Sequence, residues 1–334
     1  MVHSFKEVFV AGYGVKVYVR NGMVIVKDSN GNKAEFAPRE IDCLIIGSSG
    51  VSVTSKVIRV LMDAGADIVF LDSHGLPIGH VYPPYINRTV YTRISQYESH
   101  FNRFYEQLAK IIVYSKIANQ AGYMKYLARK YMDDAYRDTY YEILDIVKEI
   151  DELEDLELDE LRRELIVIEA KAARLYWSAI AYYLPDDICF NTRDQAGSDQ
   201  FNISLNYLYG ILYKEAWKAL VLAGLDPYLG YVHVERSGRP VLVYDFVEMF
   251  RVSCVDYPLS YAFYKGLRVD VDEKRLSYRS RMDLVGIFKK NFDRKISFNR
   301  GDRMRLEKAL KKTAFELASC LRDKRAFKGF IEDW

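Results

Sequence analysis

The periodicity of hydrophobic residues changes at two adjacent prolines, Pro83 and Pro84. Before them, apolar and polar residues alternate in short runs, which is the pattern of half-buried β-strands. After them, apolar residues recur every three or four positions, as on one face of an α-helix. Paired prolines interrupt both helices and sheets, so we expect a linker over residues 83–92. The pattern predicts an α+β fold, with a small β-rich N-terminal domain over residues 1–82 and a larger all-α C-terminal domain over residues 93–334.

The N-terminal segment contains a strong β-hairpin signal. Asn21-Gly22 separates two runs of alternating hydrophobicity, over residues 15–20 and 23–27. Further along, Thr54 is placed to cap a helix that ends at Gly65. The next apolar run, residues 68–71, predicts a buried strand.

Helical periodicity dominates the rest of the chain. An acidic run over residues 145–160 has no glycine where a calcium-binding loop needs one, so we expect a solvated helix or helix–loop that lies away from any DNA. Helices are predicted over residues 101–130, 135–150, 161–183 and 201–223, and again after Pro240.

Composition excludes several classes of protein. Half of the 334 residues are hydrophobic and the net charge is +2, which is ordinary for a globular chain. No window approaches eighteen uncharged apolar residues and the N-terminus lacks the apolar core of a signal peptide, so we expect a cytoplasmic protein with no membrane association. The four cysteines are scattered, which argues against a zinc knuckle and against a disulfide framework.

Positive charge is concentrated near the C-terminus. Residues 274–328 carry 18 Lys and Arg against six Asp and Glu, a net charge of +12, and aromatic residues punctuate the segment. Such a basic tail is typical of binding to a phosphate backbone, although an amphipathic helix pair with solvated lysines has the same composition. The candidate DNA-binding residues of the tail are Lys289, Lys290, Arg303 and Arg305.

The residues most suited to chemistry lie in the stretch 224–251. His233 is followed by Asp245 and Glu248, which are three positions apart and so share one face of the helix predicted after Pro240. Two carboxylates with an imidazole suit a divalent metal ion. A solvated helix face together with a hydrogen-bonded core histidine is the alternative.

A further carboxylate, Glu169, lies beside the apolar stripe of the helix predicted over residues 161–183. Burying it is costly unless a cation pairs with it, and we expect Lys171, Arg174 or another cation to do so.

Four segments carry a resemblance to a known family: residues 51–75, 169–177, 199–209 and 224–251. The second is similar to the family's E-x-x-x-A-R-x-Y-W helix and the third to its D-x-x-N-x-x-L-x-Y segment. The last is similar to the long signature G-L-D-P-x-x-G-x-x-H…D-x-x-E-x-F-R. The chain resembles the CRISPR-associated adaptation endonuclease/integrase family over nearly its whole length.

The resemblance implies a catalytic helical domain, a homodimer formed through the small domains, and a small ferredoxin-like partner subunit. It also implies a metal site for Mg²⁺ or Mn²⁺ in which Glu169, His233 and Glu248 are ligands and Asp245 supports activity. Position 248 is Glu where some relatives carry Asp, and Met249 stands where Pro is common.

The implied reaction belongs to CRISPR adaptation, an antiviral defence. A spacer DNA 3′-hydroxyl attacks a repeat phosphodiester, and with water as the attacker the same site is a nuclease for double-stranded or branched DNA. A stand-alone nuclease acting on branched DNA and a non-catalytic DNA-binding scaffold are the alternatives. The candidate phosphate clamps, each of which could equally be a structural ion-pair partner, are Arg174, Arg236, Arg239 and Arg251.

Overall fold

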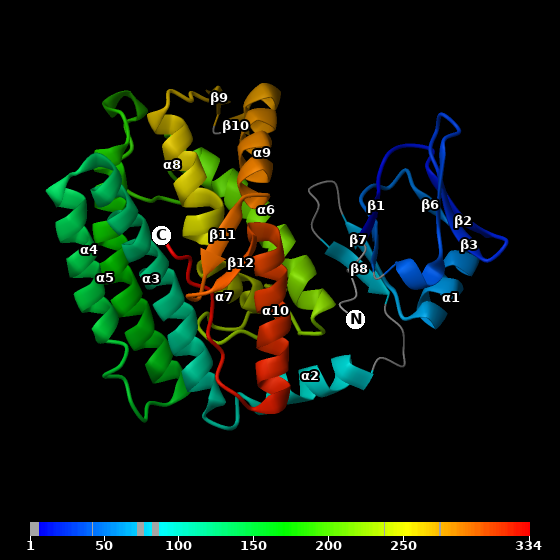
Figure 1. The fold of residues 1–334 in the computed structure, drawn as a ribbon, viewed down its shortest axis with the longest axis horizontal. Helices are drawn as coiled ribbons and strands as arrows, with labels where there is room; N and C mark the ends of the chain where they lie inside the picture. Colours follow the sequence, from blue (N-terminus) through cyan, green and yellow to red (C-terminus); the bar gives the residue numbers. More distant parts are fainter. Residues whose placement is uncertain (1–6, 42, 72–76, 82–86, 237, 274) are drawn as a thin grey trace. The chain divides into compact units, whose positions relative to one another are not determined.

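The chain divides into two compact units, Met1–Val90 and Tyr91–Trp334 (Figure 1). The computed structural model describes residues 7–41, 43–71, 77–81, 87–236, 238–273 and 275–334. Pro83 and Pro84 lie outside the described residues, as do residues 72–75 of the first resemblance segment and Lys274 at the start of the basic tail. Helix α2 (Asn87–Glu98) begins inside the stretch predicted as linker, and the predicted domain limits stay a prediction.

The first unit contains two four-stranded sheets. The sheet with order β1-β5-β7-β8 is parallel except for its last pair, and the sheet with order β4-β3-β2-β6 is antiparallel except for β2 and β6. The strands are β1 (Glu7–Val10), β2 (Lys16–Arg20), β3 (Met23–Lys27), β4 (Lys33–Phe36), β5 (Cys43–Ile46), β6 (Ser52–Val53), β7 (Asp67–Leu71) and β8 (Pro77–Val81).

Local signals account for much of this unit. The predicted hairpin is confirmed as β2 and β3, and both residues of its turn, Asn21 and Gly22, have positive φ. The predicted helix is α1 (Ser55–Ala64), which ends at Gly65 in the left-handed conformation. Thr54 stands at its N-cap position, but its side chain makes no capping hydrogen bond, so this detail of the prediction is wrong.

The second unit is mostly helical, which confirms the predicted fold class. It also contains two short hairpins, β9 (Val271–Asp272) with β10 (Arg275–Leu276) and β11 (Lys295–Phe298) with β12 (Asp302–Arg305), so the domain is not all-α. The helices after α2 are α3 (Phe104–Tyr131), α4 (Asp134–Lys148), α5 (Leu158–Tyr183), α6 (Gln200–Leu222), α7 (Val241–Glu248), α8 (Tyr257–Tyr264), α9 (Tyr278–Phe292) and α10 (Leu306–Asp323), with a π-helix at Val252–Asp256.

The acidic run is a helix–loop, as predicted, because α4 ends at Lys148 and a loop leads to the start of α5 at Leu158, while its placement away from DNA stays a prediction. Within the part of the chain that the structure describes, no helix combines the length and the apolar character needed to cross a bilayer.

Helix α3 is the element that positions the site. It packs beside α4 and α5 (Figure 1) and also contacts α7. Its buried residues include polar ones as well as apolar ones. Asn119 donates to the carbonyl oxygens of Ser115, Met249 and Phe330, at 2.8–3.0 Å, and accepts the N–H of Glu332 at 2.9 Å. These bonds fix α3 against the end of α7 and the C-terminal segment.

Candidate functional site

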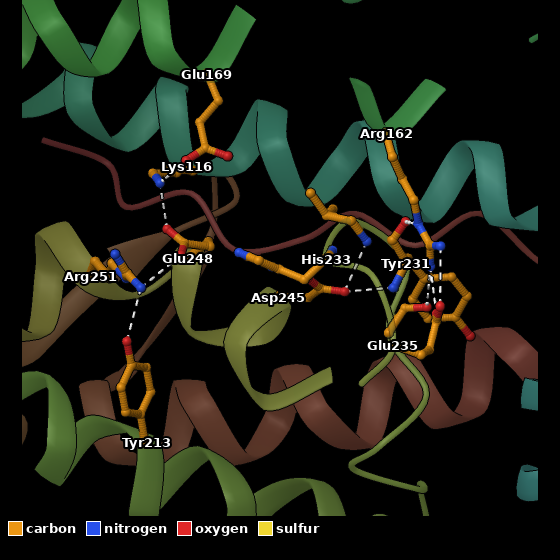
Figure 2. Close-up of polar contacts among 12 residues, drawn as sticks. Lys116, Arg162, Glu169, Tyr213, Tyr231, His233, Glu235, Asp245, Glu248 and Arg251 are labelled. Atoms are coloured by element: carbon orange, nitrogen blue, oxygen red, sulfur yellow. Dashed lines mark hydrogen bonds and ion pairs between the residues drawn. The ribbon is translucent and has the colours of Figure 1, made fainter. Parts of the chain in front are cut away.

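His233 and Asp245 form what we call the imidazole side of the site (Figure 2). His233 lies in the loop between α6 and α7, and Asp245 lies on α7 with its side chain fully buried. The Asp245 carboxylate accepts the backbone N–H of Tyr231 at 2.5 Å and those of Val232 and His233 at 3.0 Å, and one of its oxygens is 2.6 Å from His233 Nδ1. A Cβ at Gly230 would stand 2.6 Å from the same carboxylate, so this close approach needs glycine.

Arg162 on α5 holds the other edge of the same loop. Its guanidinium donates to the carbonyl oxygens of Tyr231 at 3.1 Å and Gly230 at 3.4 Å, and it forms two bonds with Glu235, at 2.5 and 3.2 Å. Sequence reasoning missed this residue. The sequence did contain a clue to its role. Arg162 follows Leu161 at the start of the apolar stripe of a predicted helix, and an arginine buried there needs hydrogen-bond or ion-pair partners.

Glu169, Lys116 and Glu248 form the carboxylate side (Figure 2). They come from α5, α3 and the end of α7. Lys116 Nζ lies 2.6 Å from Glu248 Oε2 and makes an ion pair with Glu169 Oε1, while Arg251 binds the other oxygen of Glu248 at 2.8 Å. The cation that pairs with Glu169 is therefore Lys116.

The two cations expected to pair with Glu169, Lys171 and Arg174, lie elsewhere. Lys171 binds Glu149 at 2.7 Å, and Arg174 is exposed on α5. On a helix, only side chains three or four positions apart face each other, and Lys171 and Arg174 are two and five positions from Glu169, which explains why neither is its partner.

The charges of the two sides influence each other. Burial would lower the pKa of His233, but the hydrogen bond to Asp245 and the charges of Asp245, Glu248 and Glu169 together raise that pKa above its ordinary value. Burial would raise the pKa of Glu248, but the charges of Arg251 and Lys116 hold it below its ordinary value. Burial opposes the charge of Lys116 as well, yet Glu248 and Glu169 raise the pKa of that ammonium. Both Lys116 and Glu248 are therefore charged at neutral pH.

A cavity of about 450 Å³ opens beside His233. Three arginines line it: Arg193, Arg239 and Arg251. The guanidinium carbons of Arg251 and Arg193 lie 4.7 and 5.6 Å from the centre of the Tyr209 ring, so stacking orients both of them. Several guanidinium groups next to an imidazole make a site suited to a phosphate group.

Arg193 was not predicted, although the segment that holds it was. Asn202 and Asn206, both within the resemblance segment 199–209, accept hydrogen bonds from its guanidinium at 3.0 and 2.5 Å. Asp199 caps α6 by accepting the N–H of Asn202 at 2.8 Å. This segment therefore begins the helix and aims an arginine at the cavity.

The structure brings only some of the predicted DNA-binding residues to this cavity. Arg239 and Arg251 line it, and Arg251 is also an ion-pair partner of Glu248 and donates to the Tyr213 hydroxyl at 3.0 Å. Arg174 and Arg236 are exposed and lie outside the residues described as lining it. Lys289 and Lys290 at the end of α9, and Arg303 and Arg305 on β12, are also exposed.

The aromatic residues of the basic tail are mainly part of the core. Phe288, Phe292, Phe298 and Phe327 are buried, whereas Tyr278 and Phe315 are exposed. The basic side chains of the tail, rather than its aromatic rings, are therefore the groups available to a partner.

The carboxylate side fits a divalent ion in its chemistry. Among the described residues, no group of three or more His, Cys, Asp or Glu side chains gathers closely enough to hold a metal ion, and the ligand set Glu169, His233 and Glu248 stays a prediction. Buried Glu248 Oε2, however, has the Lys116 ammonium as its ion-pair partner at 2.6 Å and shares this cation with Glu169. Two carboxylates that converge on positive charge, beside an imidazole, suit Mn²⁺ and tolerate Mg²⁺.

Fold and site together define a class: a two-unit α+β protein whose helical unit holds paired carboxylates and an imidazole beside an arginine-lined cavity. The model of the family described as CRISPR associated protein Cas1 matches residues 8–281, and the chain belongs to this family. It is 34% identical over 328 residues to CRISPR-associated endonuclease Cas1 2 from Saccharolobus solfataricus, covering 98% of each chain. The family predicted from the motifs is thereby confirmed.

Solved structures share the fold. A chain of a partial Cas6-RT-Cas1–Cas2 complex matches with a TM-score of 0.71 and 20% identity, covering 98% of both chains. A casposase bound to its integration product matches with a TM-score of 0.67 and 24% identity, covering 97% of this chain and 93% of that one.

Proposed function

We propose that this protein is a metal-dependent DNA endonuclease and integrase of CRISPR adaptation, which joins a spacer DNA 3′-hydroxyl to a repeat phosphodiester. The observation that carries the proposal is the meeting of Glu169 and Glu248 on one positive charge, beside His233 and a cavity lined by arginines. The family supports it, since a relative that is 34% identical is named an endonuclease. A protein of the same fold is described as bound to an integration product.

Glu169, His233 and Glu248 would hold the ion, Mg²⁺ or Mn²⁺, which supplies a Lewis acid that polarises a phosphodiester oxygen. The chain's own residues supply orientation. Asp245 engages His233 Nδ1 and so leaves Nε2 as the nitrogen for a metal, as carboxylates commonly do for metal-bound histidines. Arg193 and Arg239 would bind phosphate oxygens in the cavity.

The reaction is an exchange of phosphate esters. The attacking 3′-hydroxyl oxygen forms a new P–O bond as the P–O bond to the repeat's 3′ oxygen breaks, and the hydroxyl proton is balanced by one taken up by the leaving oxygen. Nothing is oxidised, and no protein nucleophile is needed. With water as the attacker, the same arrangement hydrolyses DNA.

The test compares two substitutions in one loop. His233→Ala should reduce Mn²⁺-dependent cleavage and strand transfer by about 100-fold or more, because it removes a ligand and leaves the exposed basic surface intact. Val234→Ala, at a neighbouring exposed position, should leave both activities unchanged. Thermal melts and DNA affinity serve as controls. Full activity of His233→Ala at wild-type stability would overturn the proposal, and cleavage of branched DNA without strand transfer would favour a stand-alone nuclease.

We also propose that the protein works as a homodimer and with a small ferredoxin-like partner subunit. Each sheet of the first unit ends in edge strands, β1 and β8 in one and β4 and β6 in the other, and edge strands favour association. A solved chain of this fold belongs to an assembly whose description includes Cas2. Sedimentation at micromolar concentration should give a dimer, and a monomer would contradict the first half of this proposal.

A further inference from the structure

Lys116 occupies the position between the two carboxylates of the carboxylate side (Figure 2). Its side chain is only 10% exposed, its Nζ is 2.6 Å from Glu248 Oε2, and it forms an ion pair with Glu169. Asn119, on the same helix, hydrogen-bonds three carbonyl oxygens and holds α3 in place. Lys116 therefore projects from a helix that is held in place, and its ammonium lies between the two carboxylates.

We infer that Lys116 is a resident counter-ion, which holds Glu169 and Glu248 together in the metal-free protein and must withdraw when a divalent ion binds. The inference rests on the proposed metal site. An ammonium and a metal ion cannot both contact Glu248 Oε2 and Glu169 Oε1, and two cations a few ångströms apart in a buried site repel each other strongly. Arg251 can remain, because it binds the other oxygen of Glu248.

The balance of charge gives the consequence. Glu169 and Glu248 carry two negative charges, and Lys116 and Arg251 carry two positive ones, so the group is neutral without a metal. A divalent ion added to this group would raise its net charge to +2 with the lysine in place, and only to +1 if the lysine leaves. Lys116 therefore weakens metal binding while it stabilises the metal-free fold. Without a cation, the carboxylates of buried Glu248 and partly buried Glu169 would destabilise that fold.

The experiment measures Mn²⁺ binding to the full chain by the electron paramagnetic resonance signal of the free ion. Lys116→Met removes the charge, and Lys116→Gln removes the charge but keeps a hydrogen-bond donor. Both should bind Mn²⁺ roughly tenfold more tightly than the natural chain, because a competing cation is gone. Lys116→Met should also melt at a lower temperature without metal and recover with Mn²⁺. The matched control is Lys171→Met, whose lysine binds Glu149 away from the site, and its affinity should not change.

Glu248→Gln separates failure of this inference from failure of the proposed function. If Glu248→Gln abolishes saturable Mn²⁺ binding while the Lys116 variants bind with unchanged or lower affinity, the metal site stands and the counter-ion role is overturned. If Glu248→Gln binds Mn²⁺ like the natural chain, the proposed metal site itself fails, and the counter-ion role fails with it.

A second measurement uses the natural chain and does not depend on the variants folding. Reductive methylation followed by mass spectrometry reports how accessible each lysine is. Labelling of Lys116 should rise several-fold when Mg²⁺ is present, whereas labelling of Lys171, which is already 46% exposed, should stay the same. Equal labelling of Lys116 with and without Mg²⁺ would overturn the inference.

Discussion

The two sides of the site are held in place by different kinds of contact. On the imidazole side, the buried Asp245 carboxylate accepts three backbone N–H groups and fixes the His233 ring. On the carboxylate side, Glu169 and Glu248 are held by the side chains of Lys116 and Arg251. Backbone hydrogen bonds are part of the fold itself, whereas a side-chain cation can exchange for another cation. The comparison indicates that the imidazole side is preorganised by the backbone, whereas the cation bound on the carboxylate side can be exchanged for another cation.

The largest effect on stability is expected on the imidazole side. Asp245→Asn places an amide NH₂ where a carboxylate oxygen accepts backbone N–H groups, so the free energy of unfolding should fall by about 3 kcal/mol. Amide exchange of Tyr231, Val232 and His233 should accelerate with it. Asp226→Asn is the matched control, because among the described residues Asp226 accepts one backbone N–H, that of Tyr228 at 2.9 Å, together with the Tyr97 hydroxyl at 2.7 Å. Equal losses in the two variants would remove the distinction between the sides.

A smaller loss of stability is expected on the carboxylate side. Glu248→Gln leaves Lys116 and Arg251 facing a neutral amide, which should lower the free energy of unfolding by about 2 kcal/mol, and Mn²⁺-dependent cleavage should be lost. Glu248→Asp keeps the charge on a shorter side chain and should retain partial activity. Chemical denaturation and cleavage assays on both variants check this. A Glu248→Gln protein that cleaves DNA normally would show that the carboxylate side is only structural.

Exposed cations should behave differently from the buried ones. Charge reversal at Lys289, Lys290, Arg303 and Arg305 should change the free energy of unfolding by less than about 0.5 kcal/mol. DNA affinity should fall for all sequences, and the salt dependence should lose roughly one counter-ion for each phosphate contact removed. The control is charge reversal at Arg137 and Lys148, exposed on α4. Salt-independent affinity, or affinity that survives the four reversals, would show that the tail is a solvated surface.

A pH-dependent contribution to stability is expected from Asp256, in the π-helix that follows Arg251. Burial raises the pKa of Asp256, although hydrogen bonds from Tyr209 and Tyr176 and the charge of Arg251 oppose the rise. A carboxyl group whose pKa is higher in the folded state favours folding at low pH, and this contribution is lost as the pH rises through the folded pKa. The free energy of unfolding of the natural chain, minus that of Asp256→Asn, should therefore decrease from about pH 3.5 to about pH 7. Urea denaturation across this range checks it, and a difference that increases with pH would contradict the assignment.

The sequence correctly predicted those turns and helices that are determined by residues close together in the chain. The Asn21-Gly22 turn, the helix that stops at Gly65 and the long helices of the second unit each depend on nearby residues, and all of them are present. The proximity of His233 and Asp245 could also be predicted, because both lie in one short stretch of sequence and α7 begins next to Pro240.

The partners that the prediction missed come from distant segments. Lys116 precedes Glu169 by 53 positions, and Arg162 precedes Glu235 by 73. Spacing along one helix cannot show which helix packs opposite, and a lysine on a helix buried on most of its faces looks like any surface lysine in sequence. The basic tail shows the opposite error, because four of the aromatic rings assigned to its DNA-binding character fill the core.

The central claim is that Glu169, His233 and Glu248 form one metal site despite their different supports. Anomalous diffraction from crystals soaked in Mn²⁺ tests it most directly. The account predicts one strong peak within coordination distance of both carboxylates and of the His233 imidazole, with Lys116 withdrawn. A protein that saturates with Mn²⁺ in solution but shows its anomalous peak away from these three side chains would contradict the account.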